Sequence, residues 1–151
     1  MASTPTPTWD GARLLGVQCL LAPDDLADRR RLQGLLCERV RALAADKAPI
    51  PVTILQPGDP RLIEDDTAVL LIHASVQPQS GGKPLLVLAA RSFRATAAPS
   101  ELFGATPRAV PMAPDVRGPQ IDAALNAALA EILPWRVRPH GPRPLPPPRR
   151  P

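Results

Sequence analysis

Aromatic side chains are scarce in this chain of 151 residues. Tyrosine is absent, and two Trp and two Phe make up the whole aromatic set, which is 3% of the sequence. A surface that stacks the bases of single-stranded nucleic acid needs several aromatic rings, so we do not expect such a surface. A hydrophobic core is still expected, because 44% of the residues are apolar, and Leu, Val, Ile and Ala must build it.

Long hydrophobic runs are also missing. A membrane-spanning helix needs about 20 consecutive apolar residues, whereas the longest apolar stretches, residues 68–72 and 85–90, have the length of β-strands. Residues 1–8 lack the basic and apolar segments of a secretory signal. We therefore expect no membrane span and keep two locations open: the periplasm, if a signal peptide precedes this chain, and otherwise the cytoplasm.

Residue types that carry out catalysis or bind metals are few. The two Cys and the isolated His73 and His140 match no ligand spacing of a zinc site. The sequence contains neither a Gly-x-Ser-x-Gly nucleophile turn nor a glycine-rich phosphate loop. We therefore expect no metal, no cofactor and no catalytic residue. One alternative stays open, a small enzyme that uses His73 and the region of Asp65 and Asp66.

The excess of positive charge is confined to one end of the chain. The whole sequence carries a net charge of +4, but residues 135–151 contain five Arg and neither Asp nor Glu. The remaining 13 basic residues are opposed by 14 acidic residues, so residues 1–134 have a formal charge of −1. Binding of nucleic acid by a basic domain surface is therefore not expected.

The same end of the chain is rich in proline. Residues 134–151 contain eight of the 22 prolines, and Pro144, Pro147 and Arg149 fit the pattern Pro-x-x-Pro-x-Arg. Such segments adopt a polyproline II conformation and dock on aromatic grooves of partner proteins. A disordered, soluble end is the alternative. A second function class follows from this tail: a cytosolic regulatory protein whose Arg/Pro-rich end binds nucleic acid or a proline-recognising partner.

Hydrophobic periodicity predicts an α+β fold with the order β-α-β-β-β-(β)-α. Apolar residues alternate in the expected strands and recur at helical spacing in two amphipathic helices. The expected strands are residues 13–22, 52–56, 67–77, 85–94 and a weak edge strand at 108–112, and the expected helices are 25–46 and 118–133. We expect a mainly antiparallel sheet with both helices packed on one face. Residues 11–134 then form a single domain between a disordered lead, 1–10, and a basic, Pro-rich disordered tail, 135–151.

The segment 67–77 changes its pattern along its length. It begins with apolar residues on both faces and then alternates, with His73, Ser75 and Gln77 on one face. This change indicates a strand in the middle of the sheet that is half exposed toward its end. The exposed residues 75–77 and the edge strand at 108–112 are the candidate contact regions for a partner.

Two cysteines lie on elements that are expected to pack together. Cys19 belongs to the apolar face of the first strand, and Cys37 lies at the shoulder of the apolar stripe of the first helix. If that helix packs on this face of the sheet, the two residues can form a disulfide, which would add roughly 3 kcal/mol of stability. The alternative is a pair of buried free thiols. A disulfide would favour an oxidising compartment such as a periplasm.

In its order of elements, residues 13–133, the chain resembles small domains of the bacterial cell envelope. Examples are the amino-terminal domain of the Tol–Pal translocation protein and domains of curli-secretion lipoproteins. The resemblance implies no functional residue, but it agrees with a non-catalytic accessory domain that binds a protein partner through a sheet surface or edge. The identity of the partner and the oligomeric state do not follow from the sequence.

Overall fold

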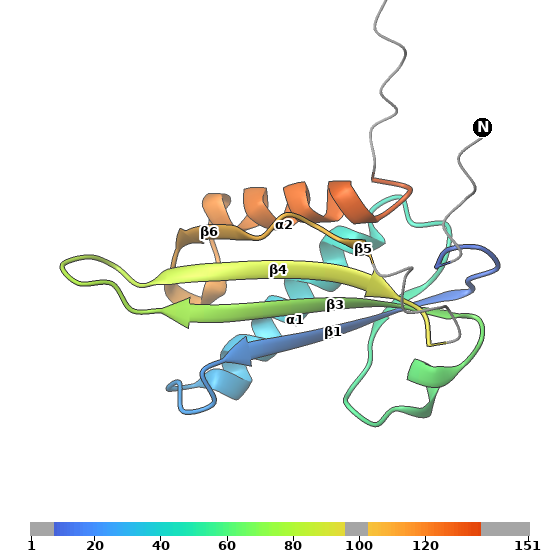
Figure 1. Cartoon of the computed structure of the whole chain (residues 1–151), viewed down its shortest axis with the longest axis horizontal. Helices are drawn as coiled ribbons and strands as arrows, with labels where there is room; N and C mark the ends of the chain where they lie inside the picture. Colours follow the sequence, from blue (N-terminus) through green and yellow to red (C-terminus); the bar gives the residue numbers. More distant parts are fainter. Residues whose placement is uncertain (1–7, 96–102, 137–151) are drawn as a thin grey trace, which may run out of the picture.

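A sheet with two α-helices behind it makes up residues 8–95 and 103–136, the part of the chain that the computed structural model describes (Figure 1). The strands are β1 (Leu14–Ala22), β2 (Val52–Ile54), β3 (Thr67–Gln77), β4 (Leu85–Phe93), β5 (Phe103–Gly104) and β6 (Arg108–Pro111). The helices are α1 (Arg29–Ala45) and α2 (Pro119–Ile132), with the short 3-10 turns η1 (Pro60–Ile63) and η3 (Pro114–Val116). The expected α+β class and order of elements are confirmed.

The sheet of the described residues is mixed, and three of its five strand pairings are antiparallel, so it is mainly antiparallel as expected but not purely so. Its strand order is β2-β1-β3-β4-β5, and β6 pairs with β4 beyond the short β5. β1 is parallel to both β2 and β3, whereas β3, β5 and β6 are antiparallel to β4. The parallel half arises because the chain returns from β1 to β2 through α1, and a helical crossover brings the next strand back in the same direction.

Both helices pack on the same face of the sheet, as the two apolar stripes predicted. Alternate residues of β1, β3 and β4 point toward the helices, because successive side chains of a strand lie on opposite faces. The largest fully buried side chains of this layer are Leu15, Val17, Leu70, Ile72 and Leu86 from the strands and Leu36, Val40, Ile121, Leu125 and Leu129 from the helices. The core is thus aliphatic.

The first helix begins later than its sequence pattern suggested. The pattern predicted a helix from residue 25, but α1 starts at Arg29, after Asp24 and Asp25, and has no acidic residue in its first turn. Asp28 precedes the helix in a left-handed backbone conformation and makes no capping hydrogen bond with its side chain. The residues between Pro23 and Asp28 form turns, so the helix dipole is not compensated by these carboxylates.

The two ends of the described chain pack against each other. The rings of Trp9 and Trp135 meet edge to face with 5.4 Å between their centroids. The Nε1–H of Trp135 donates to the carbonyl of Ala44 over 2.9 Å, and Arg136 forms an ion pair with Asp46 at 3.1 Å. The packed unit therefore extends beyond the expected limits of 11 and 134 at both ends.

Candidate binding surfaces

The face of the sheet that carries no helix is covered over only part of its length. Leu55, which follows β2, lies over the beginning of β1 and is only 2% exposed. A Cβ atom added to Gly16 would lie 2.3 Å from Leu55 Cδ1, so glycine is what allows Leu55 to pack so closely on β1. Val69 in the neighbouring β3 is fully buried on the same face. This cover explains why the sequence of β3 begins apolar on both faces.

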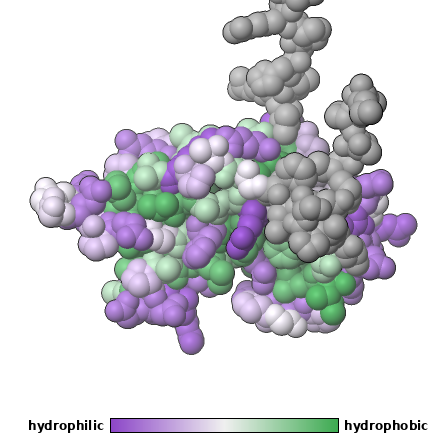
Figure 2. Space-filling view, viewed as in Figure 1, coloured by the Kyte–Doolittle hydropathy of each residue, from purple (hydrophilic) through white to green (hydrophobic). Residues whose placement is uncertain are grey.

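Toward the C-terminal ends of β1 and β3, no other element of residues 8–95 and 103–136 covers this face. We define the helix-free patch by the neighbouring side chains Leu20, Leu71, His73, Val87, Ala89 and Arg91, which the strand register places side by side. Leu20 is 44% exposed, and Leu71, Val87 and Ala89 are half-buried. Figure 2 looks onto this face and shows apolar areas between polar ones over the strands. The patch combines exposed or half-buried apolar side chains with Arg91 and His73, and the polar Gln18 and Ser75 lie on the same face beside it.

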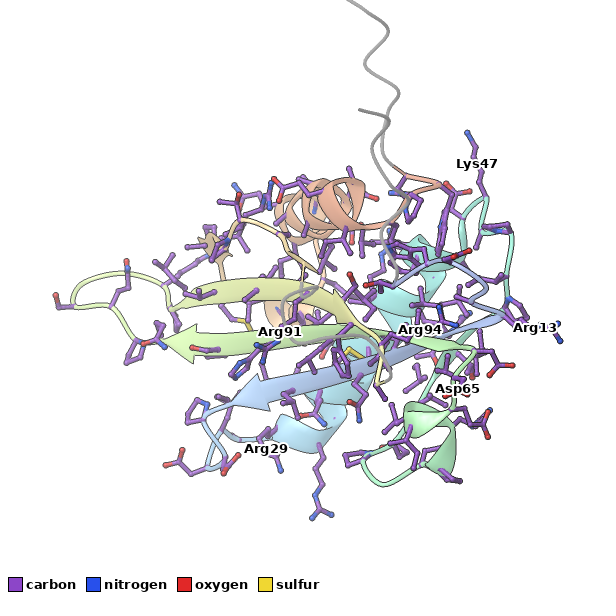
Figure 3. The ribbon with its side chains drawn as sticks, turned by 45° about the vertical axis from the view of Figure 1, so that its right-hand side comes forward. Arg13, Arg29, Lys47, Asp65, Arg91 and Arg94 are labelled. Carbon is purple, nitrogen blue, oxygen red and sulfur yellow. A yellow bond between two sulfur atoms is a disulfide. The ribbon has the colours of Figure 1, made fainter. Side chains whose placement is uncertain are left out.

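The charge of the helix-free patch is positive. Arg91 and His73 are exposed, and β1, β3 and β4 contain neither Asp nor Glu. Figure 3 shows Arg91 on the sheet at β4. Among the residues that the structure describes, no carboxylate forms an ion pair with Arg91. A guanidinium group surrounded by aliphatic side chains suits a carboxylate that is itself flanked by apolar groups.

Several charged side chains on the helical side form ion pairs within the described residues. Arg39 of α1 donates two hydrogen bonds of 2.8 Å to the carboxylate of Asp122 in α2 and lowers the pKa of this carboxyl group below its usual value. Arg108 binds Glu131 over 2.8 Å. The pKa of Glu131 is lowered by this bond and by the backbone N–H of Thr106. These bridges join α1 to α2 and α2 to the region of β6.

A groove lies at the outer edge of β1, next to the helix-free patch. β2 ends at Ile54, which is opposite Val17, and the N–H of Leu55 donates to the Val17 carbonyl over 2.9 Å. Within residues 8–95 and 103–136, no strand pairs with the rest of β1 on this side. A cavity of about 640 Å³ opens there, between β1, α1 and the residues that follow β2.

Cys19 and Cys37 form a disulfide at this groove. The bond joins β1 to α1, with the two Cα atoms 5.5 Å apart, and both residues line the groove. The first helix packs on the face of β1 from which Cys19 projects, which is the arrangement on which the sequence-based hypothesis of a disulfide depended. The bond fixes the distance between the two walls of the groove.

The residues of the alternative enzyme site are not brought together. Asp66 precedes β3 and His73 lies near its middle, so at about 3.3 Å per residue the two are roughly 20 Å apart. Asp65 is at the same end as Asp66, beside β3's start (Figure 3). In the described part of the chain, no group of three or more His, Cys, Asp or Glu residues is arranged to hold a metal ion. The geometry therefore contradicts an acid–base pair of His73 with Asp65 or Asp66.

The structure describes two further regions that were predicted to contact a partner, residues 108–112 and residues 75–77. The edge strand expected at 108–112 exists as β6, which pairs with residues 85–88 of β4. The residues 75–77 end β3 next to the helix-free patch, and Gln77 is exposed. The proposed docking residues Pro144, Pro147 and Arg149 lie outside the described residues.

Sequence reasoning missed most of the helix-free patch and the whole groove. One signal was present: β1 carries apolar side chains on both faces at Leu20 and Leu21, although only Leu21 is needed for the core. The groove left no such signal, because it depends on where β2 ends relative to β1.

The fold and these surfaces define an α+β domain with one helix-covered and one partly open sheet face. No family model matches the chain, and no curated protein matches it. Among solved structures, it is similar to a variant of PelC from Paraburkholderia phytofirmans, crystallised as a dodecamer, with 12% identity and a TM-score of 0.45 over 83% of this chain and 87% of that chain. A second PelC dodecamer from the same organism gives 10% identity and a TM-score of 0.42 over 81% and 89%.

A hypothetical protein of Chlamydia trachomatis is similar at 7% identity and a TM-score of 0.34, over 66% of this chain and 70% of that chain. At these identities the similarities assign no role to any residue of the present chain. Within the described residues, neither helix has the length and apolar character that a membrane crossing requires.

Proposed function

We propose that this chain is a non-catalytic binding domain whose helix-free patch contacts an acidic and partly apolar surface of a protein partner. The observation that carries the proposal is the composition of the patch, in which Arg91 and His73 lie among aliphatic side chains without any carboxylate on the three strands. Parallel strands are usually covered on both faces, and of the strands under the patch β1 and β3 are a parallel pair, whereas β3 and β4 are antiparallel. A partner that covers Leu20 and its neighbours would complete this layering.

The patch has the features of an interface core rather than of ordinary surface. Contiguous exposed apolar side chains on a soluble domain mark interaction sites, and Arg is enriched in such interfaces. A carboxylate of the partner placed on Arg91 would form a charge-assisted hydrogen bond in an environment from which aliphatic groups exclude water. The proposed partner therefore presents Asp or Glu beside apolar side chains.

We place the domain in an oxidising compartment such as a bacterial periplasm. The disulfide between Cys19 and Cys37 supports this location, because structural disulfides persist in oxidising compartments and are rare in reducing ones. The order of elements found in small envelope domains agrees with it. The accessory role proposed here needs only the sheet surface and no catalytic group.

Site-specific photo-crosslinking in cells that make the protein tests the proposal. A photoreactive phenylalanine analogue at Ala89 or Val87 is expected to give one defined adduct of higher mass. The same group at Ala123, which is exposed on α2, serves as the matched control and is expected to give none. The additional substitution Arg91→Glu should abolish the Ala89 adduct. Equal adducts from Ala89 and Ala123, or an adduct unaffected by Arg91→Glu, would contradict the proposal.

A further inference from the structure

The outer edge of β1 offers backbone groups that no neighbouring strand uses. The N–H of Leu15 donates to the carbonyl of Pro51 over 3.0 Å, and the carbonyl of Val17 accepts from Leu55. Because backbone groups of successive residues point to opposite sides of a strand, those of Cys19 and Leu21 point to the same side as those of Leu15 and Val17. β2 has already ended there. The N–H and C=O of Cys19, which lines the groove, therefore point to this outer edge.

One of the backbone groups on this edge is bound by a side chain instead of by a neighbouring strand. The N–H of Leu21 donates to Oε1 of Gln33 in α1 over 3.0 Å. This bond closes the far end of the edge and leaves the backbone of Cys19, which lines the groove, as the position to which a further strand can pair. The groove is thus bounded by β2 at one end and by Gln33 at the other.

Gly34 gives the groove its width. It lies inside α1 and lines the groove, and a Cβ atom built on it meets no heavy atom within 4 Å. Glycine inside a helix destabilises it relative to alanine, and no packing contact within the described chain requires glycine here. The space above Gly34 is therefore not filled by any side chain of the described residues.

The charges along the groove differ between its two ends. Arg29 and Arg30 line the end beside Leu21, and the guanidinium of Arg29 is 3.3 Å from Oε1 of Gln33. Figure 3 shows Arg29 at the beginning of α1, beside the C-terminal part of β1. Glu38 lines the groove one residue beyond Cys37. A ligand with an acidic group at the Arg29 end matches this pattern.

The shape of the groove favours a single extended chain over a second copy of this domain. The walls formed by α1 and by Gln56 and Pro57 enclose the edge from two sides, so a single extended chain fits it, whereas the β1 strand of a second copy would bring its own α1 into the same space. The chain's own tail is a poor occupant, because proline offers no N–H for pairing and its arginines would face Arg29 and Arg30.

We infer that this groove binds an extended segment of another protein, which pairs with the backbone of Cys19 as a short added strand and places a carboxylate beside Arg29 and Arg30. Strand addition of this kind takes its affinity from main-chain hydrogen bonds and its specificity from side-chain pockets. The disulfide holds α1 and β1 at a fixed distance and so keeps the groove preformed. The groove adjoins the helix-free patch and shares Leu20 with it, but Ala89 and Arg91 of the patch do not line the groove.

A library of random decapeptides displayed on a carrier protein provides the probe. The oxidised protein is used for selection, and enriched peptides are then synthesised and titrated. We expect alternating apolar residues with Asp or Glu near one end, and protection of the Cys19 amide from hydrogen exchange on binding. Arg29→Gln combined with Arg30→Gln should weaken binding about tenfold or more, as expected for loss of a charge-assisted hydrogen bond.

Filling the groove is the decisive test. Gly34→Gln is expected to abolish peptide binding while keeping the fold, since it replaces glycine by a better helix former. Ala123→Gln on α2 is the matched control and should bind as the unmodified protein does. Ala89→Glu, which disrupts the helix-free patch, should also leave peptide binding unchanged, so failure of one proposal is distinguishable from failure of the other.

Three results would overturn the inference. The first is a selection that enriches no peptide. The second is an unchanged affinity of the enriched peptides for the Gly34→Gln variant, and the third is an unchanged affinity for the variant that lacks both Arg29 and Arg30. Self-association that is abolished by Gly34→Gln, measured by analytical ultracentrifugation, would also overturn it, because a second copy would then be the occupant.

Discussion

Reduction of the Cys19–Cys37 disulfide is expected to lower the free energy of unfolding by roughly 3 kcal/mol. The bond closes a loop with a sequence separation of 18 residues, and the chain entropy released when a loop of this size opens gives roughly that value. The two cysteines join β1 to α1 inside the core. The folded state therefore keeps its packing after reduction, and the change acts mainly on the unfolded chain.

Equilibrium unfolding in urea measures this effect. With a denaturant dependence of about 1–3 kcal/mol per molar urea, the loss of roughly 3 kcal/mol moves the midpoint down by about 1–3 M. The unmodified protein is compared with and without a reducing agent. The double variant Cys19→Ala, Cys37→Ala is the control, and its midpoint should not respond to the reducing agent.

Two observations would refute the reasoning. One is a pair of free thiols titrated in the unfolded protein before any reduction, which would mean that the bond does not form. The other is a urea midpoint that stays the same on reduction although the thiols are released. This result would mean that the loop between the two cysteines is already constrained in the reduced, unfolded chain, so that the disulfide removes no further entropy.

Three further predictions concern stability. Gly16→Ala should lower the free energy of unfolding by about 1–3 kcal/mol, because the new methyl group would overlap Leu55, and chemical denaturation measures the loss. Gly34→Ala should raise the same free energy by about 1 kcal/mol, since the added Cβ meets open space, and an unchanged or lower midpoint would contradict this. The pKa of Asp122 is lowered in the folded state by Arg39, so its contribution is complete above the ordinary pKa near 3.8 and is lost as the pH falls through the lower, folded value. Melting temperatures measured through this acid range should therefore fall less steeply for Asp122→Asn than for the unmodified protein.

The sequence was sufficient for the elements but not for the direction of the strands. The helical spacing of Leu32, Leu36 and Val40 predicted α1 and its buried side, and the same logic predicted α2. The pattern of 67–77 correctly indicated a central strand whose end is half exposed. The strand–helix–strand order was a signal for parallel pairing of β1 with β2 that the expectation of a mainly antiparallel sheet did not use. Alternation alone did not reveal the parallel pairing of β1 with β3, because it reports which face is buried and not which way the neighbouring strand runs.

The candidate surfaces were predictable only in part. The exposed end of β3 was identified from its alternation, and His73 was placed on the correct face. The groove depends on the point at which β2 stops opposite Val17, and register of this kind is set by tertiary packing rather than by local pattern. Gly34 could be read from the sequence only as a weak position in a helix, because the open space above it is a property of the assembled fold.

The contact between Trp9 and Trp135 brings the two ends of the described chain together. Since the two indole rings meet, a short linker between the ends of the described chain could close the backbone into a ring, and folds with adjacent ends tolerate this change. New ends could then be opened in the connection between β3 and β4, at the opposite end of the sheet (Figure 1). Such a circular permutant would keep the pairing of every strand. Its new N- and C-termini would leave the domain at the opposite end of the sheet from the present ones.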